Sequence, residues 1–218
     1  DSSGSMNGQP IAQAKHAIER GLRLMQPDDT FQLINFSNNA SQLGPAPLAA
    51  SRKNIQRGLD YLNTINGEGG TMMIEGIKAA LDFPHDPKRL RFVVFCTDGY
   101  IGNETEIFGE VHNRLRDSRI FSFGVGTSVN RYLLDGLARL GSGAVAYLSL
   151  NENATPVMDT FFERISHPAM TDLVADWGGL EVTDVYPHKL HDLFVGRPMI
   201  ITGRFKGTPA GTIHIKGK

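Results

Sequence analysis

The apolar residues along this chain repeat with two different periods. Spacings of three and four residues predict amphipathic helices, and short runs rich in apolar residues predict strands, of which 90–96 and 120–125 are expected to be covered on both faces. The predicted helices begin near Gln9, Ser51, Thr71, Asn103, Tyr132 and Thr155. The predicted strands occupy residues 31–36, 90–96, 120–125 and 145–150. This alternation predicts an α/β fold with a doubly wound, mostly parallel sheet flanked by helices.

The pattern changes near His167, beyond which only strand-like runs remain. Those runs cover residues 173–177, 180–186, 199–205 and 212–215. Gly178-Gly179 predicts a hairpin turn between the first two runs. Roughly fifty residues of strand and turn are too few to bury a good core alone. We therefore expect residues 1–166 to form an α/β domain, and residues 167–218 to be a β-strand-rich segment that belongs to a second β domain.

The composition excludes several classes of partner. The 218 residues carry a formal net charge of −1, which gives no electrostatic reason to expect a nucleic acid or an anionic membrane. No apolar run approaches the roughly 20 residues that span a bilayer, so we expect no membrane insertion of this fragment. The single cysteine, Cys96, excludes an intrachain disulfide and a cysteine-based zinc site. Its apolar neighbours predict a buried, unreactive thiol.

The first five residues, Asp1-Ser2-Ser3-Gly4-Ser5, form the pattern D-x-S-x-S. Alternate side chains of an extended segment point the same way, so the oxygens of Asp1, Ser3 and Ser5 can converge on one point. One carboxylate and two hydroxyls suit a hard cation such as Mg²⁺, and they do not suit zinc or copper. Taken alone, the same five residues also fit a polar turn that caps a helix.

Two further oxygen donors are expected at the same place, because ligands bind at the carboxyl ends of the strands in an open parallel sheet. Asp98 follows the predicted strand 90–96 closely, and Thr71 follows two glycines and precedes a helix. Thr71 could also cap that helix, and Asp98-Gly99 could be a simple turn. The sequence predicts a divalent cation, Mg²⁺ first and Mn²⁺ or Ca²⁺ as alternatives. Its predicted ligands are Asp1, Ser3, Ser5, Thr71 and Asp98.

This combination resembles the von Willebrand factor A-type (vWA) domain, whose metal-ion-dependent adhesion site (MIDAS) is D-x-S-x-S, then a Thr, then an Asp. The resemblance covers residues 1–166, and the five residues occur in the family's order. The later segments 170–173, 177–179 and 185–187 are similar to the region that follows this domain in inter-alpha-trypsin inhibitor heavy chains and their bacterial relatives. Residues 97–104 look more like the bacterial members.

The resemblance implies a division of roles among the five residues. Ser3 and Ser5 would bind the cation directly, and Thr71 would bind it directly or through water. Asp1 and Asp98 would act largely through water or hydrogen bonds. With so few direct carboxylates, the cation keeps a strong attraction for one more, which an Asp or Glu of a partner protein provides.

The chain departs from the family at its start. In the family, a central hydrophobic strand leads directly into the first Asp, and that strand is absent here. The chain begins at Asp1 without an initiator Met or a signal peptide, so we expect a fragment or a processed product. We also expect an upstream segment of the same protein, or another polypeptide, to supply the strand beside the 31–36 and 90–96 strands.

The leading hypothesis is a metal-dependent protein–protein adhesion module of a secreted, cell-surface or periplasmic protein. One alternative is an intracellular module of the same fold that assists an ATPase or a metal-insertion complex. A second is a Mg²⁺-dependent phosphatase of the haloacid dehalogenase type, which needs a second Asp two residues after the first, where Ser3 stands. The patterns G-x-S-x-G and H-E-x-x-H and a Walker A loop are also absent, so we predict no enzymatic activity.

Overall fold

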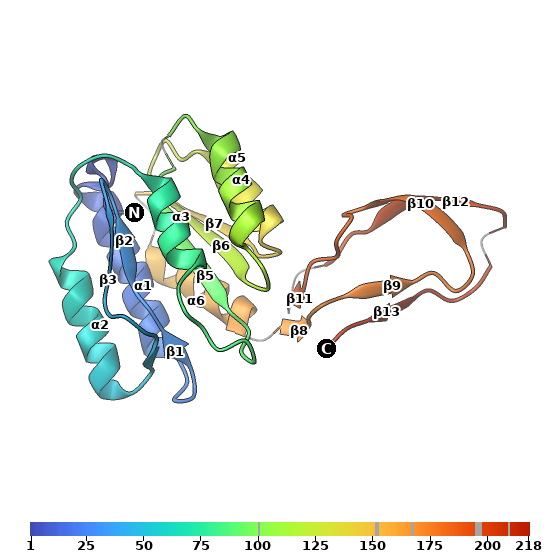
Figure 1. The fold of residues 1–218 in the computed structure, drawn as a ribbon, viewed down its shortest axis with the longest axis horizontal. Helices are drawn as coiled ribbons and strands as arrows, with labels where there is room; N and C mark the ends of the chain where they lie inside the picture. The colour runs from blue at the N-terminus through green and yellow to red at the C-terminus, as the bar shows by residue number, and fades with distance from the viewer. Residues whose placement is uncertain (100, 151–152, 167, 195–197, 209) are drawn as a thin grey trace. The chain divides into compact units, whose positions relative to one another are not determined.

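The structure is a computed structural model that describes residues 1–99, 101–150, 153–166, 168–194, 198–208 and 210–218 (Figure 1). Contacts divide the chain into two compact units, Asp1–Thr160 and Phe161–Lys218. A short 3-10 turn, Gly4–Met6, comes first. The helices that follow are α1 (Gln9–Leu24), α2 (Arg52–Thr64), α3 (Met73–Leu81), α4 (Glu104–Arg114), α5 (Arg131–Leu140) and α6 (Ala154–Ser166). The last of them crosses the division between the units.

Three parallel strands form the centre of the first unit. The strands of this unit are β1 (Thr30–Phe31), β2 (Ile34–Phe36), β3 (Ala40–Gln42), β4 (Leu48–Ala49), β5 (Phe92–Thr97), β6 (Arg119–Val125) and β7 (Val145–Leu148). β5, β6 and β7 hydrogen-bond in that order, with Phe92 opposite Arg119 and Ser122 opposite Val145. Helices α3, α4 and α5 pack side by side, and α5 and α1 both contact β6 (Figure 1). The prediction of an α/β fold with a mostly parallel sheet flanked by helices is confirmed.

The central strand β6 is buried at all seven of its positions. Ile120 belongs to a core cluster with Phe36 of β2 and with residues of α3, α4 and α5 such as Ile77, Ile107 and Leu134. The prediction of a strand covered on both faces is therefore confirmed for β6. Paired strands on both sides occupy its backbone hydrogen bonds, and helices α5 and α1 contact it.

The same prediction is wrong for the first part of the 90–96 run. Leu90 lies before β5 and is 44% exposed, and Val94 within the strand is 38% exposed. Burial is complete only over the last three residues, 95–97. Within the described part of the chain β5 pairs with β6 alone, so it has a strand on one side only.

The predicted strand 31–36 consists of two short strands, β1 and β2. β1 pairs antiparallel with β4, and β2 pairs antiparallel with β3. The side chain of Gln32 explains the break: its Nε2 donates to Gly44 O at 2.6 Å, and its Oε1 accepts from Leu33 N at 2.9 Å. Among the described residues β2 and β5 do not pair with each other. A further strand between them stays a prediction.

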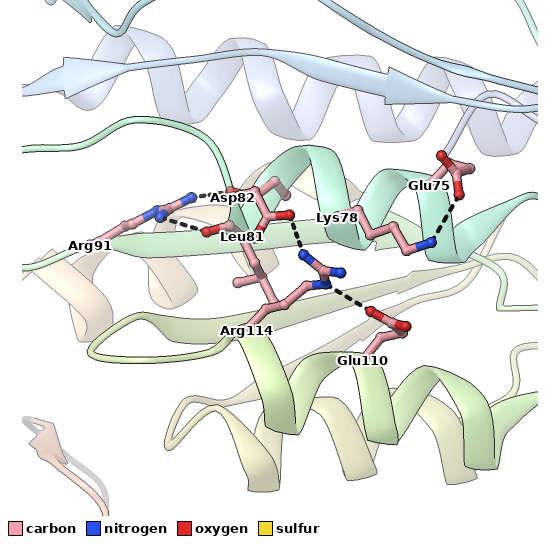
Figure 2. Close-up of polar contacts among 8 residues, drawn as sticks. Glu75, Lys78, Leu81, Asp82, Arg91, Glu110 and Arg114 are labelled. Carbon is pink, nitrogen blue, oxygen red and sulfur yellow. Dashed lines mark hydrogen bonds and ion pairs between the residues drawn. The ribbon is translucent and has the colours of Figure 1, made fainter.

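Charged side chains tie α3 to its neighbours (Figure 2). Arg114, the last residue of α4, forms an ion pair with Glu110, with 2.7 Å between Nε and Oε2. It forms a second ion pair with Asp82, which directly follows α3. Arg91 donates to the carbonyls of Leu81, at 3.1 Å, and Ala80. These are carbonyls of the last turn, which a helix leaves without internal partners. The hydrogen bond from Arg114 lowers the pKa of Glu110, and burial lowers the pKa of Arg91.

The second unit is built from short antiparallel pairs. Its strands are β8 (Pro168–Met170), β9 (Val174–Asp176), β10 (Glu181–Tyr186), β11 (Leu193–Phe194), β12 (Thr202–Lys206) and β13 (His214–Lys216). β8 pairs with β11, β9 with β13 and β10 with β12. The prediction of a strand-rich segment after the α/β domain is confirmed.

The predicted hairpin at Gly178-Gly179 is wrong, although a turn is present. Both glycines have positive φ, 62° and 89°, and Leu180 N donates to Trp177 O at 3.1 Å. The flanking strands β9 and β10 nevertheless pair with β13 and β12 and not with each other. The backbone of Thr212 explains the need for glycine, because a Cβ on Gly178 would lie 2.2 Å from Thr212 O.

Candidate metal centre

The D-x-S-x-S segment lies between the carboxyl ends of β2 and β5. Ser2 N donates to the carbonyl of Phe36, the last residue of β2, at 2.8 Å. The α-amino group of Asp1 donates to Cys96 O, near the end of β5, at 3.0 Å. Gly4 N donates to Gly69 O at 2.9 Å, which joins the segment to the loop before α3. These backbone bonds hold the first residues at the carboxyl edge of the sheet.

Both carboxylate oxygens of Asp1 are engaged by the protein. Oδ1 accepts from Ser3 N at 2.9 Å, and Oδ2 accepts from the hydroxyl of Thr97. The Thr97 hydroxyl in turn accepts from Gly99 N at 2.8 Å. A carboxylate with both oxygens in hydrogen bonds is suited to orient the loop and to act on a cation indirectly.

The hydroxyls of Ser3 and Ser5 lie side by side, with 3.1 Å between the two Oγ atoms. Two oxygens bound at right angles to one Mg²⁺, each at about 2.1 Å, lie about 3.0 Å apart. The observed spacing therefore fits two neighbouring ligand positions of an octahedral ion. Ser3 is buried and Ser5 is exposed, so the pair is open to solvent on one side only.

Asp98 and Thr71 reach the same edge of the sheet from two other segments. Asp98 is buried directly after β5, and its carbonyl accepts from Asn130 N at 2.9 Å. Thr71 is half-buried, and its hydroxyl makes no hydrogen bond to another described residue. Gly70 N, just before it, donates to Asn38 Oδ1 at 2.7 Å.

The alternative in which Thr71 caps α3 is wrong. The helix begins at Met73, and the residue that precedes it, Met72, makes no side-chain cap bond. Met72 N instead donates to the carbonyl of Ser37 at 2.7 Å. The β2–β3 turn thus holds the residue that precedes the helix, and the Thr71 hydroxyl is left for another partner.

Sequence reasoning missed two residues that support the loop, Thr97 and Asn35. Asn35 Nδ2 donates to Ser2 Oγ at 3.2 Å, and Ser2 Oγ donates to Phe36 O at 3.1 Å. Asn35 Oδ1 accepts from Ser41 Oγ and from the Tyr61 hydroxyl, both at 2.6 Å. The available signal was a polar side chain inside an otherwise apolar strand, close to the end where the site lies.

Burial shifts the pKa values of two ionisable groups at the D-x-S-x-S segment. The Cys96 thiol is buried, as predicted, and burial raises its pKa to about 11. Burial also lowers the pKa of the Asp1 α-amino group to about 6. A buried thiol that is neutral at neutral pH is unreactive, which is the behaviour of a packing residue.

The donor set fits a hard divalent cation. No group of three or more His, Cys, Asp or Glu side chains that could hold a metal ion occurs among the described residues. The predicted ligand set instead combines hydroxyl oxygens with two carboxylates, Asp1 and Asp98. Hydroxyl, carboxylate and water oxygens are the ligands of Mg²⁺, Mn²⁺ and Ca²⁺, and soft metals prefer sulfur and imidazole.

Curated relatives of this chain are several times longer than it. It is 28% identical over 202 residues to a von Willebrand factor A domain-containing protein of Dictyostelium discoideum, an alignment that covers 92% of this chain and 22% of that protein. It is 26% identical over 235 residues to human inter-alpha-trypsin inhibitor heavy chain H4, with 100% of this chain and 25% of the relative covered. The chain thus spans about a quarter or less of the length of these relatives.

Solved structures share the fold. A von Willebrand factor type A protein from Catenulispora acidiphila aligns with a TM-score of 0.73 and 16% identity, over 99% of this chain and 55% of that one. Proximal thread matrix protein 1 from the mussel byssus, solved with zinc in its MIDAS motif, aligns with a TM-score of 0.55 and 16% identity. The alignment covers 74% of this chain and 43% of that one. A family model for the von Willebrand factor type A domain matches residues 1–147. The chain belongs to the von Willebrand factor type A domain family.

Proposed function

We propose that this chain is a metal-dependent protein-binding module, without enzymatic activity of its own. Its ligand set is Asp1, Ser3, Ser5, Thr71 and Asp98, and the cation is Mg²⁺, with Mn²⁺ or Ca²⁺ as alternatives. The observation that carries the proposal is the 3.1 Å spacing of the Ser3 and Ser5 hydroxyls beside a carboxylate, Asp1, that is itself fully hydrogen-bonded.

The residues of the site divide the work between binding and orientation. Ser3 and Ser5 offer neutral oxygens, while Asp1 holds the loop through Ser3 N and the Thr97 hydroxyl. When bound, the cation supplies an electrophilic position that accepts an oxygen of an Asp or Glu side chain from a partner protein. Neutral direct ligands leave most of the cation's charge for that carboxylate. This is recognition of a partner, and it requires no bond to be made or broken.

The phosphatase alternative lacks its second carboxylate, because the hydroxyl of Ser3 stands where the acid would be and lies against Ser5. An extracellular, cell-surface or periplasmic location is part of the proposal, and it rests on the similarity to inter-alpha-trypsin inhibitor heavy chains. In the part of the chain that the structure describes, no helix combines the length and the apolar character needed to cross a membrane.

Carboxylate binding can be tested with a small probe. Acetyl-aspartate methylamide is added to the ¹⁵N-labelled chain with Mg²⁺, and the backbone amide shifts of Ser5, Gly70 and Gly99 are followed. We expect shifts that saturate with Mg²⁺ and disappear with EDTA. The neutral analogue acetyl-asparagine methylamide is the matched control. Equal shifts with both probes, or shifts that survive EDTA, would overturn the proposal.

A further inference from the structure

A polar hollow opens beside the candidate metal centre. Its volume is about 410 Å³, and polar side chains of the β2–β3 hairpin between Asn35 and Ser41 line it together with Glu68 and Gly69. Neither the cation nor its expected ligands account for this space, because none of the five ligand residues lines it.

The hollow and the metal centre share a stretch of backbone. Glu68 N donates to Ser2 O at 2.9 Å, and Gly69 O accepts from Gly4 N at 2.9 Å. Glu68 and Gly69 therefore line the hollow while they bond directly to the D-x-S-x-S segment. This shared backbone places the hollow directly beside the D-x-S-x-S segment.

The lining combines a single charge with amide and hydroxyl groups that can accept or donate hydrogen bonds, and among them the Oδ1 of Asn38 is already occupied by Gly70 N. Glu68 is the only charged residue that lines the hollow; it is exposed, and its carboxylate has no ion-pair partner within the described ranges. Asn35 forms part of the wall and is committed to the protein through Ser2, Ser41 and Tyr61. Among the described residues the side chains of Ser37 and Asn39 have no hydrogen-bond partner, so both remain for a ligand.

We propose that this hollow is a second recognition subsite that takes a basic side chain of the partner, Arg in preference to Lys. The proposal rests on the proposed function for the metal half of the contact. A guanidinium group has five donors in a planar arrangement, which can bond the Glu68 carboxylate and neighbouring hydroxyl and amide oxygens together. The ammonium group of Lys is a compact point charge with three donors, and it matches a spread of acceptors less well. The partner is then a segment in which a basic residue lies near the acidic residue that the cation takes.

The hollow can be tested without the metal. Acetyl-arginine methylamide is titrated into the ¹⁵N-labelled chain in EDTA, with the neutral citrulline analogue as the matched probe. We expect the amides of Ser37, Asn39 and Glu68 to shift with the arginine probe, and to shift much less with citrulline. Equal shifts with both probes, or no shift with either, would overturn the subsite.

A charge variant and its control assign the binding to Glu68. Glu68→Gln is expected to weaken the arginine probe about threefold, the size of effect that an exposed ion pair gives. Asp28→Asn removes the same charge from an exposed turn before β1, on a side chain with no partner among the described residues, and should leave the affinity unchanged. An equal loss in both variants would show a general charge effect and contradict the assignment.

Linked peptides separate this inference from the proposed function. Acetylated peptides carry one Asp and, one to four positions away, either Arg or citrulline, and they are titrated with Mg²⁺ and with EDTA. We expect Mg²⁺-dependent binding that is tighter for Arg at one or more spacings. Mg²⁺-dependent binding without any Arg preference would overturn the subsite and leave the metal site standing. If Arg-containing peptides bind in the hollow but Mg²⁺ never strengthens their binding, the subsite for a basic side chain stands and the metal-dependent function is contradicted.

Discussion

At the scale of single residues, Thr97 connects the buried end of β5 to the first residue of the site. Its side chain has no exposed surface, and its hydroxyl bonds both Asp1 Oδ2 and Gly99 N. One hydroxyl thus fixes the D-x-S-x-S segment and the turn that follows Asp98. In the proposed metal centre, Thr97 would therefore be a positioning residue that does not touch the cation.

Thr97→Val tests that role, because valine has nearly the same shape and no hydroxyl. The change leaves Gly99 N and one oxygen of Asp1 without a partner, so we expect the free energy of unfolding to fall by about 1–3 kcal/mol and the affinity for Mg²⁺ to weaken. Denaturant unfolding and calorimetry measure the two effects, and Thr97→Ser is the control that keeps the hydroxyl. A valine variant that matches wild type in both measurements would show that the Thr97 hydroxyl supports neither the fold nor Mg²⁺ binding.

Tyr147 of β7 provides a prediction on pH. Its hydroxyl donates to Asp135 Oδ1 at 2.7 Å, and the Arg131 guanidinium lies 3.9 Å from the centre of its ring. Burial, followed by the Asp135 hydrogen bond, raises the pKa of Tyr147 to about 12. An unfolded tyrosine has a pKa of about 10. Stability from this group is therefore complete below about pH 10 and is lost as the pH rises toward 12.

Tyr147→Phe should accordingly flatten the decline of stability in that alkaline range. The measurement is the free energy of unfolding between pH 9 and about 12 in wild type and variant, together with absorbance at 295 nm for tyrosine ionisation. The same slope in both proteins would show that Tyr147 is not the group responsible.

At the scale of elements, α3 packs closely against β2 where Gly76 meets Phe36. A Cβ on Gly76 would lie 2.4 Å from Phe36 Cδ1. Gly76→Ala is expected to force the helix and strand apart and to lower the free energy of unfolding by about 1–3 kcal/mol. Gly109 of α4 is the matched control, since a Cβ there meets nothing within 4 Å. Gly109→Ala should be stabilising by about 0.5–1 kcal/mol, and a loss equal to that of Gly76→Ala would contradict the packing argument.

The strands of the second unit bury little of their apolar surface. All residues of β12 and β13 are exposed, and large apolar side chains are exposed at Val174, Tyr186, Ile200, Phe205, Ile213 and Ile215. We therefore expect residues 171–216 alone to show no cooperative thermal unfolding by circular dichroism. A sharp transition that is independent of concentration would show that this segment closes a core of its own.

At the scale of the whole molecule, the sequence predicts those features that depend on local pattern. β6 was recognisable because Ile120, Phe121, Phe123 and Val125 make it mainly apolar, and α1 because Pro10 lies in its first turn. The break at Gln32 depends on a side-chain bond to Gly44, twelve residues away. The pairing of β9 with β13 joins residues about forty positions apart, such as Asp176 and His214. Neither the break at Gln32 nor the pairing of β9 with β13 leaves a pattern in the neighbouring sequence.

In the candidate site, too, the sequence predicts what depends on local pattern and misses what depends on contacts between distant segments. The motif itself predicts Asp1, Ser3 and Ser5 as ligands, and the strand-end position predicts Asp98; these stay predictions. The support from Thr97 is not visible in sequence, because it depends on which segments meet at the sheet edge. The polar hollow depends likewise on the contact of a hairpin with the loop at Glu68.

The most direct test of the central claim is calorimetric titration of the chain with Mg²⁺ and Mn²⁺, in wild type and in Asp98→Ala. The proposed site has two carboxylates, Asp1 and Asp98, so the variant would remove one of the two negative charges expected near the cation. We expect one cation to bind per chain at millimolar concentrations or below, and Asp98→Ala to lose most of this binding. Ser3→Ala removes a direct ligand, and we expect it to weaken the affinity by a smaller amount. No binding at millimolar metal, or equal binding by wild type and Asp98→Ala, would contradict the central claim and reduce the D-x-S-x-S segment to a polar turn.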